Sequence, residues 1–415
     1  MNRNAFKTVA ATEDNERYAE LVARPEPLYS RPDEIRSPFA RDYTRILHST
    51  AFRRLKHKTQ VFYNVDNDHV CTRLEHVAHV ESVANTIAKY LGLNDELTRA
   101  ISFGHDIGHA PFGHFGERVL SKLSQEYLGC TFWHERSGLR FVDSLELLED
   151  DNKNLRNLNL TYAVRDGIIS HCGEVDQNGI FPRDELIDLY SINAPGKYQP
   201  ATWEGCVVKI ADKIAYIGRD IEDALALGFL APAQVEELGA MAQSSGALNT
   251  TVIIHELIGD ICANSSPSAG IRLSPSAEKK MNAVKLFNYK NIYSNPRFEP
   301  YHDYARLVLN GLFNVLMGLY TPEYAIANVY NAQKYYPLLC SSFAAWLAKL
   351  SDVAAVPEQG GLKELSGRCK NVRPYGALAS ERDYAAAAID FLAGMTDKFA
   401  VRVHSELLSY RTAGF

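Results

Sequence analysis

The sequence is poor in cysteine, and its few cysteines are not spaced as pairs. Seven cysteines are spread over 415 residues, and no two of them form a Cys-x-x-Cys motif. Secreted disulfide scaffolds and zinc knuckles need denser or more regular cysteines. We therefore interpret the seven as reduced thiols, which favours a cytoplasmic protein.

Long apolar runs and an excess of positive charge are also missing. No apolar run approaches the ~20 residues that a membrane-spanning helix needs, and the first residues contain no apolar signal core. The net charge of −6 argues against a protein that coats nucleic acid with a basic surface. We expect a soluble protein, and a local basic pocket is compatible with this charge.

Composition and periodicity together predict the fold class. The hydrophobic fraction of 46% and the charged fraction of 23% are those of an ordinary globular protein. The length exceeds the usual size of one hydrophobic core, so we expect either one large domain with an appended lobe or two domains. Strand-like alternation is confined to short pieces such as residues 60–65. The sequence therefore predicts an all-α protein, a helical bundle with additional C-terminal helices.

The most informative stretch has the pair His105-Asp106 at its centre. An amphipathic helix that starts near residue 73 carries His76 beside its apolar stripe. A second helix, capped by Asn94, ends at the His105-Asp106 pair. A single histidine beside an apolar face is more often a core or surface residue. Here two consecutive helices place His76 within reach of the pair, which favours a ligand.

The segment that follows, HDIGHAPFGHFGE, is rich in glycine and proline. Such a sequence predicts a turn rather than a continuous regular helix. A turn would arrange its polar side chains around one pocket, and these are His109, His114, Glu117 and, after a polar linker, His134. Neutral imidazole and carboxylate suit Mn, Fe, Co, Zn or Mg, so the stretch is typical of a metal site that performs hydrolysis.

A later helix, within residues 202–228, has two distinct faces. One face is a row of isoleucine and valine, and the other carries Asp212, Tyr216, Arg219 and Asp223. The polar face could lie in water, but small residues fill most of the other positions, which favours burial of both faces. In that arrangement Asp212 reaches the metal, and the residues that reach the ligand are Lys213, Tyr216 and Arg219.

Other segments carry weaker signals. Ser37-Pro38 predicts a helix start, and Gly92 predicts a helix end. The basic group at residues 53–58 is either a solvated face or an anion-binding site, and His171 is predicted to be structural. We expect further helices at residues 138–148, 159–171, 251–262 and 276–296, two helices within residues 303–350, and one long helix at residues 380–408.

Six motifs in a fixed order resemble one known family. The motifs are RILHSTAFRRLKHKTQVF, DHVCTRLEHV, GHDIGHAPFGHFGE, WHERSG, ADKIAYIGRDIEDA and DFLAGMTDKFA. Together they resemble the deoxynucleoside triphosphate triphosphohydrolases of the HD-domain superfamily, the dGTPase-like group. The resemblance extends along most of the chain, and the ordered set is far more specific than a lone His-Asp pair.

The resemblance implies roles for residues at matching positions. The implied metal ligands are His76, His105, Asp106 and Asp212. The implied catalytic residues are His114 with its orienting Glu117, and His109 and His134 near the phosphates. The implied substrate contacts are Arg73, Lys213 and Arg219 for the phosphates, and Gln60, Tyr216 and Asp220 for the deoxyribose.

The implied reaction releases deoxynucleoside and inorganic triphosphate. It needs a divalent cation, for which Mn²⁺ or Mg²⁺ is expected and Fe, Co, Ni or Zn would also suit the ligands. Protonated His114 would assist departure of the 5′-oxygen by roughly 10²–10⁴-fold. One alternative is an HD phosphohydrolase that acts on nucleoside monophosphates, cyclic nucleotides or nucleic-acid ends. Another is a non-catalytic nucleotide sensor with the same fold.

The resemblance also implies an organisation for the whole chain. We expect an N-terminal arm at residues 1–36, the HD-domain core at residues 37–230, and a helical region at residues 231–415 that completes the substrate pocket and the oligomer contacts. Relatives form dimers to hexamers, and some bind an activating nucleotide at a second site. The net charge gives little support to binding of single-stranded nucleic acid.

Overall fold

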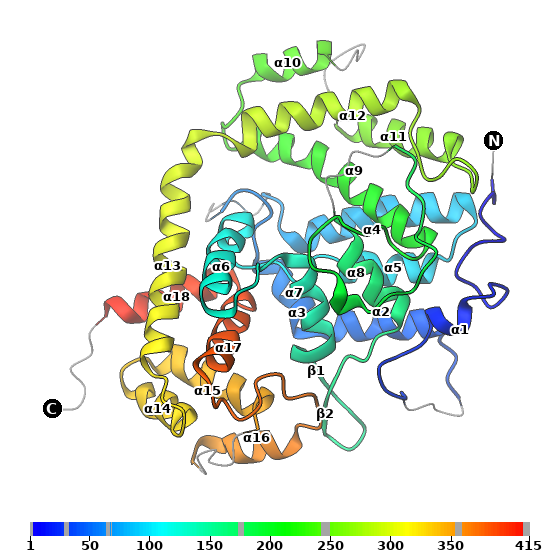
Figure 1. Ribbon diagram of the computed structural model, residues 1–415. Helices are drawn as coiled ribbons and strands as arrows, with labels where there is room; N and C mark the ends of the chain where they lie inside the picture. The colour runs from blue at the N-terminus through cyan, green and yellow to red at the C-terminus, as the bar shows by residue number, and fades with distance from the viewer. Residues whose placement is uncertain are drawn as a thin grey trace. The chain divides into compact units, whose positions relative to one another are not determined.

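A computed structural model describes most of the chain (Figure 1). The described residues are 3–28, 33–63, 67, 69–172, 178–241, 250–352 and 359–409. Their regular elements are helices apart from one two-stranded sheet, which confirms the predicted all-α class. The chain forms two compact units, each assembled from three separate segments. The expected divisions after residues 36 and 230 stay predictions.

The first unit contains Met1–Leu47, Thr59–Asp106 and Asn159–Phe298. Its helices are α1 (Tyr18–Leu21), α2 (Pro38–His48), α4 (Arg73–Leu91), α5 (Asp95–Gly104), α8 (Tyr162–Ser170), α9 (Trp203–Ala226), α10 (Pro232–Met241), α11 (Thr250–Asn264) and α12 (Pro275–Asn288). Helix α9 packs against α4, α5, α8, α11 and α12, so it is the central helix of this unit. Figure 1 shows α4 and α5 next to it.

Local capping sets the helix ends in the first unit. Ser37 Oγ accepts a hydrogen bond from the backbone of Ala40 at the start of α2. Helix α4 ends at Gly92, which has a φ of +83° that other residues rarely adopt. Asn94 Oδ1 accepts from the backbone N–H of Leu97 and caps α5. These contacts confirm the three predicted boundaries.

Close packing fixes the helix that delivers the His105-Asp106 pair. A Cβ on Gly167 of α8 would lie 2.6 Å from the Ile101 side chain on α5. A Cβ on Gly104 would lie 2.8 Å from Ile168. Only glycine therefore allows α5 and α8 to approach this closely. The apolar face of α9 is buried as predicted. On its polar face Asp223 is 5% exposed, whereas Asp212, Tyr216 and Arg219 are half-buried, so the predicted burial of this face is only partial.

The second unit contains His48–Lys58, Ile107–Leu158 and Glu299–Phe415. Its helices are α3 (Thr50–Arg54), α6 (Gly113–Leu128), α7 (His134–Arg140), α13 (Glu299–Gly318), α14 (Ala325–Asn331), α15 (Pro337–Leu350), α16 (Leu362–Arg368), α17 (Glu381–Ala393) and α18 (Asp397–Leu408). Helix α6 packs against α13 and α17, and α13 also contacts α18. A short antiparallel hairpin of β1 (Leu147–Glu149) and β2 (Leu155–Asn157) belongs to the same unit.

Several predicted elements of the second unit were wrong in detail. The long terminal helix is interrupted, because Thr396 accepts a hydrogen bond from the backbone of Phe399 and starts α18 as a separate helix. Residues 303–350 form parts of three helices rather than two. The helix expected at residues 138–148 begins earlier, at His134, and gives way to β1.

Two further expectations concern strands and membranes. In the predicted strand at residues 60–65, the described residues 60–63 form no strand, and residues 64 and 65 lie outside the described part. Thr59 instead pairs with Thr72 in an isolated antiparallel bridge. Among the described residues, no helix combines the length and the apolar character that crossing a membrane would require.

Candidate functional site

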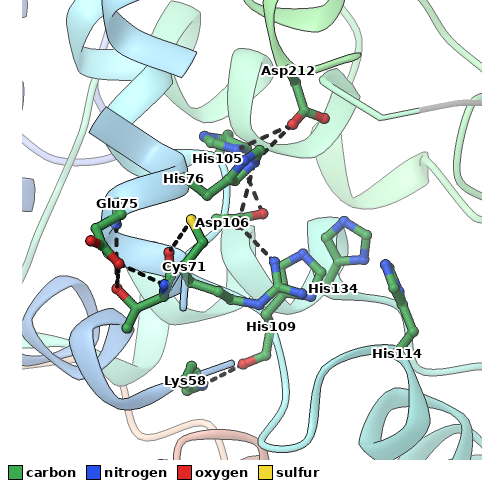
Figure 2. A network of polar contacts seen from close by, with 12 residues as sticks. Lys58, Cys71, Glu75, His76, His105, Asp106, His109, His114, His134 and Asp212 are labelled. Carbon is green, nitrogen blue, oxygen red and sulfur yellow. Dashed lines mark hydrogen bonds and ion pairs between the residues drawn. The ribbon is translucent and has the colours of Figure 1, made fainter. Parts of the chain in front are cut away.

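The four expected metal ligands converge within the first unit (Figure 2). Helix α4 supplies His76, the end of α5 supplies His105 and Asp106, and the middle of α9 supplies Asp212. His76 Nε2 lies 3.0 Å from Asp212 Oδ1 and 3.9 Å from Asp106 Oδ2. The sequence separation between His76 and Asp212 is 136 residues, so the fold creates this cluster.

The geometry of His105 fits a cation. Its Nδ1 lies 2.6 Å from the carbonyl oxygen of Ser102, and because a carbonyl only accepts, Nδ1 carries the proton. The other ring nitrogen, Nε2, is buried and has no hydrogen-bond partner among the described residues. It lies 3.6 Å from Asp106 Oδ1 and 3.9 Å from Asp212 Oδ1. A buried lone pair that faces two carboxylates is unfavourable unless a cation lies between them.

The protonation of this cluster also suits a cation. Burial alone would raise the pKa of the Asp212 carboxyl, but the hydrogen bond from His76 and the nearby imidazoles lower that pKa to about 2. Asp212 is therefore ionised at neutral pH. Two imidazoles and two carboxylates form a donor set that suits Mn²⁺, Fe²⁺, Co²⁺ or Zn²⁺.

Arg73 was expected at a phosphate, and the structure places it on Asp106, one of the candidate metal ligands. The side chain is 2% exposed, and its Nη1 donates to Asp106 Oδ2 over 2.8 Å. This buried ion pair orients the Asp106 carboxylate within the cluster. Contact between Arg73 and a phosphate stays a prediction.

His171 was expected to be structural, and it lies directly beside the cluster. Its ring is edge-on to the ring of His105, with centroids 5.0 Å apart. Its Nδ1 lies 2.7 Å from the carbonyl oxygen of Ile168, in the same arrangement as His105 with Ser102. Both histidines directly follow the last residue of a helix, and this shared position was a usable signal in the sequence.

The second unit carries a histidine cluster of its own, also drawn in Figure 2. The rings of His109 and His134 stack with centroids 3.8 Å apart and an interplanar angle of 16°. Glu117 Oε2 lies 3.2 Å from His134 Nδ1 and 3.4 Å from His114 Nδ1. Burial opposes ionisation of Glu117, but these imidazoles outweigh it and hold its pKa well below the usual range. His114 is 70% exposed.

The segment that carries these residues is only partly the expected turn. Helix α6 begins at Gly113, so His114 and Glu117 lie one turn apart on a regular helix. The glycines serve close packing, since a Cβ on Gly108 would lie 2.0 Å from the carbonyl oxygen of His134. Phe112, just before the helix, has a φ of +65°.

Sequence reasoning missed Glu135 in this second unit. Its side chain is 2% exposed, and its Oε2 lies 3.5 Å from His134 Nδ1. Neither carboxylate oxygen has a hydrogen-bond partner among the described residues. A buried carboxylate next to an imidazole can orient that ring. The dipeptide His134-Glu135 within the WHERSG motif was its only signal.

The expected substrate residues on α9 differ in their surroundings. Lys213 and Tyr216 are half-buried on the polar stripe that carries Asp212. Arg219 Nη1 donates to Glu222 over 3.1 Å. The guanidinium group of Arg219 is therefore partly exposed, and it lies on the same helix as the candidate ligand Asp212, seven residues further along the chain.

Asp220 and Gln60 were expected at the deoxyribose. Asp220 is buried, and burial raises the pKa of its carboxyl to about 7. Its Oδ2 accepts a hydrogen bond of 2.5 Å from the hydroxyl of Tyr293, a residue that sequence reasoning left unassigned. The Oε1 atom of Gln60 is buried without a hydrogen-bond partner among the described residues. Both groups therefore retain capacity for a polar ligand.

Two of the four cations in the basic group at residues 53–58 have structural roles, while Arg53 and Lys56 are exposed. Lys58 is buried, and its Nζ donates to the carbonyl oxygens of His109 and Ala393. Arg54 forms a 2.6 Å ion pair with the buried Glu146. Both cations have structural partners in the second unit.

Comparison with known proteins agrees with this geometry. The HD-domain family model matches residues 73–217, a span that includes all four candidate ligands. The chain is 37% identical over 282 residues to a deoxyguanosinetriphosphate triphosphohydrolase-like protein of Caldanaerobacter subterraneus, covering 68% of this chain and 72% of the relative. It is 30% identical over 417 residues to a protein of the same name from Rhodopseudomonas palustris, covering 91% of each. The chain therefore belongs to the deoxyguanosinetriphosphate triphosphohydrolase-like family of HD-domain phosphohydrolases.

Proposed function

We propose that this protein hydrolyses a deoxynucleoside triphosphate to deoxynucleoside and inorganic triphosphate. The observation that carries the proposal is the buried Nε2 of His105, which faces two carboxylates and has no hydrogen-bond partner in the described part of the chain. This arrangement suits a divalent cation. A divalent cation bound by imidazole and carboxylate can promote hydrolysis at phosphorus. The names of the relatives add the expectation of a deoxynucleotide.

His76, His105, Asp106 and Asp212 would hold the cation, and we propose Mn²⁺ or Mg²⁺ in that role. A bound cation supplies a Lewis acid that polarises a phosphoryl oxygen and increases the acidity of water. Arg73 would contribute by fixing the Asp106 carboxylate, because their 2.8 Å hydrogen bond is buried.

The remaining residues of the first unit would bind the nucleotide. Lys213 and Arg219 provide positive charge for the triphosphate, which an acidic protein must supply locally. Gln60, Tyr216 and Asp220 would contact the deoxyribose. In this role the ring of Tyr216 would exclude a 2′-hydroxyl, and Asp220 would exchange its bond from Tyr293 for one from the sugar.

We propose that His114 donates the proton to the leaving group. Hydrolysis adds the oxygen of water to the α-phosphorus and breaks its bond to the 5′-oxygen, which leaves poorly unless it is protonated. His114 is exposed to an incoming ligand, and its Nδ1 lies 3.4 Å from Oε2 of the ionised Glu117, which can orient the ring. His109 and His134 would contact the phosphates. In the sequence only two residues separate Asp106 from His109.

A direct assay tests the proposal. The purified protein is incubated with each dNTP and each rNTP in Mn²⁺ or Mg²⁺, and the products are separated. Release of deoxynucleoside and inorganic triphosphate from dNTPs supports the proposal. Release of orthophosphate or of a monophosphate contradicts it and favours another HD phosphohydrolase activity. A homo-oligomer, an activating nucleotide and a cytoplasmic location stay predictions of the family resemblance.

A further inference from the structure

The motif DFLAGMTDKFA at residues 390–400 has no part in the proposed chemistry, although it is one of the six family motifs. It spans the end of α17, a short break and the start of α18. Asp390 at its beginning accepts hydrogen bonds from Arg140 and Tyr375 within the second unit. Asp397, later in the motif, contacts the segment that carries the histidine cluster.

Asp397 accepts a hydrogen bond from Phe112, the residue just before α6. The backbone N–H of Phe112 donates to Asp397 Oδ1 over 2.8 Å, and the two residues are 285 positions apart in the sequence. Both are buried, at 1% exposure for Phe112 and 4% for Asp397. Phe112 also has a φ of +65°, a conformation that L residues other than glycine rarely adopt. The bond to Asp397 therefore stabilises a backbone geometry that the chain would not favour alone.

Lys58 holds the same segment at its other end. Its Nζ donates to the carbonyl oxygen of His109, as Figure 2 shows, and also to the carbonyl oxygen of Ala393 over 3.0 Å. The lysine is 2% exposed. Burying an ammonium group costs free energy, because the group loses its water. Its hydrogen bonds to two carbonyl oxygens offset this cost, and they hold the two backbone segments together. The contact joins residue 109 to the end of α17.

We propose that Asp397 and Lys58 are positioning residues, which fix the backbone of residues 109–113 and thereby set the directions of the His109 and His114 side chains. The inference rests on the proposed function, in which these two imidazoles contact the substrate. Lys58 contacts the backbone carbonyl of His109 itself, and His114 follows Phe112, the residue bound by Asp397, by two positions on α6. Misplacing a reacting group by about 1 Å can cost 10²-fold in rate.

The test compares three variants. Asp397→Ala removes the acceptor, whereas Asp397→Asn keeps an oxygen that can accept from Phe112. Thr396→Ala is the matched control, because it removes the cap of the same helix without touching residues 109–113. We expect kcat to fall about 10- to 100-fold in Asp397→Ala and to stay within about threefold of the wild type in the other two. We expect KM and metal content to change little in all three.

Hydrogen exchange followed by mass spectrometry provides a readout that does not depend on activity. A peptide that includes Phe112 should exchange faster in Asp397→Ala than in Thr396→Ala or Asp397→Asn. Equal exchange and equal kcat in Asp397→Ala and Thr396→Ala would overturn the inference. If the wild type hydrolyses no dNTP, the proposed function fails, while the exchange experiment still decides whether Asp397 positions the segment.

Discussion

The Nε2 atom of His105 lies 3.9 Å from Asp212 Oδ1 and is not hydrogen-bonded to it. The hydrogen bond between His105 Nδ1 and the Ser102 carbonyl fixes the proton on the far side of the ring. Nε2 therefore presents a lone pair to a carboxylate that is ionised at neutral pH. A positive charge between the lone pair and the carboxylate makes this contact favourable. We therefore expect both residues to be needed for metal binding.

Replacing either residue should abolish tight metal binding. We expect His105→Ala and Asp212→Ala to weaken Mn²⁺ affinity by at least about 100-fold, because each variant removes a direct ligand. Metal content after dialysis, measured by elemental analysis, checks this. His79→Ala is the matched control, since His79 lies on the same helix as His76 but is exposed. Full metal content in His105→Ala would remove the site assignment.

The Arg73–Asp106 ion pair should contribute strongly to stability. Arg73→Met leaves the Asp106 carboxylate buried without its cationic partner, so we expect a loss of about 3–5 kcal/mol in the free energy of unfolding. The loss should be smaller with saturating Mn²⁺, because a bound cation compensates the same carboxylate. Denaturant unfolding with Mn²⁺ and with a chelator measures both values. The exposed pair Lys89–Asp95 provides a control, and Lys89→Met should change stability by no more than about 1 kcal/mol.

His114 and Glu117 should act as one catalytic unit. Their 3.4 Å contact implies that the acid works only with its carboxylate partner. We expect His114→Ala and Glu117→Gln each to lower kcat by roughly 10²–10⁴-fold with metal and substrate still bound. The double variant should be no slower than the slower single variant. Rate losses that multiply in the double variant would show that the two residues act independently.

Local sequence signals predicted much of this structure. The caps at Ser37 and Asn94 and the glycine stop at residue 92 need only neighbouring residues, and all three were predicted correctly. Helical periodicity predicted that His76 and Asp212 approach the His105-Asp106 pair, and the family motifs implied the same four residues. Local signals and motifs together therefore predicted many of the helices and the four candidate ligands that the fold brings together.

Other features could not be read from local patterns. The bond between Phe112 and Asp397 joins residues 285 positions apart, and no periodicity encodes such a contact. The unusual φ of Phe112 was equally hidden, because glycine and not phenylalanine is the usual marker of that conformation. The alanine-rich run at residues 381–393 hid the end of α17, since its helical pattern continues beyond the point where Thr396 starts a new helix.

Asp220 should make stability depend on pH. Burial raises the pKa of its carboxyl from 3.8 to about 7, so between these values the folded state binds this proton and the unfolded state does not. Lower pH therefore favours folding, and the contribution of Asp220 is lost as the pH rises through 7. Between pH 6 and pH 8 this loss amounts to about 1 kcal/mol.

The variant Asp220→Asn isolates this effect, because an amide does not titrate and can still accept from the hydroxyl of Tyr293. Urea unfolding of both proteins at pH 6 and pH 8 gives the comparison. We expect the wild type to lose about 1 kcal/mol more than Asp220→Asn over this range. The same change in both proteins would mean that Asp220 is ionised throughout, and that its hydrogen bond with Tyr293 is a bond to a charged carboxylate.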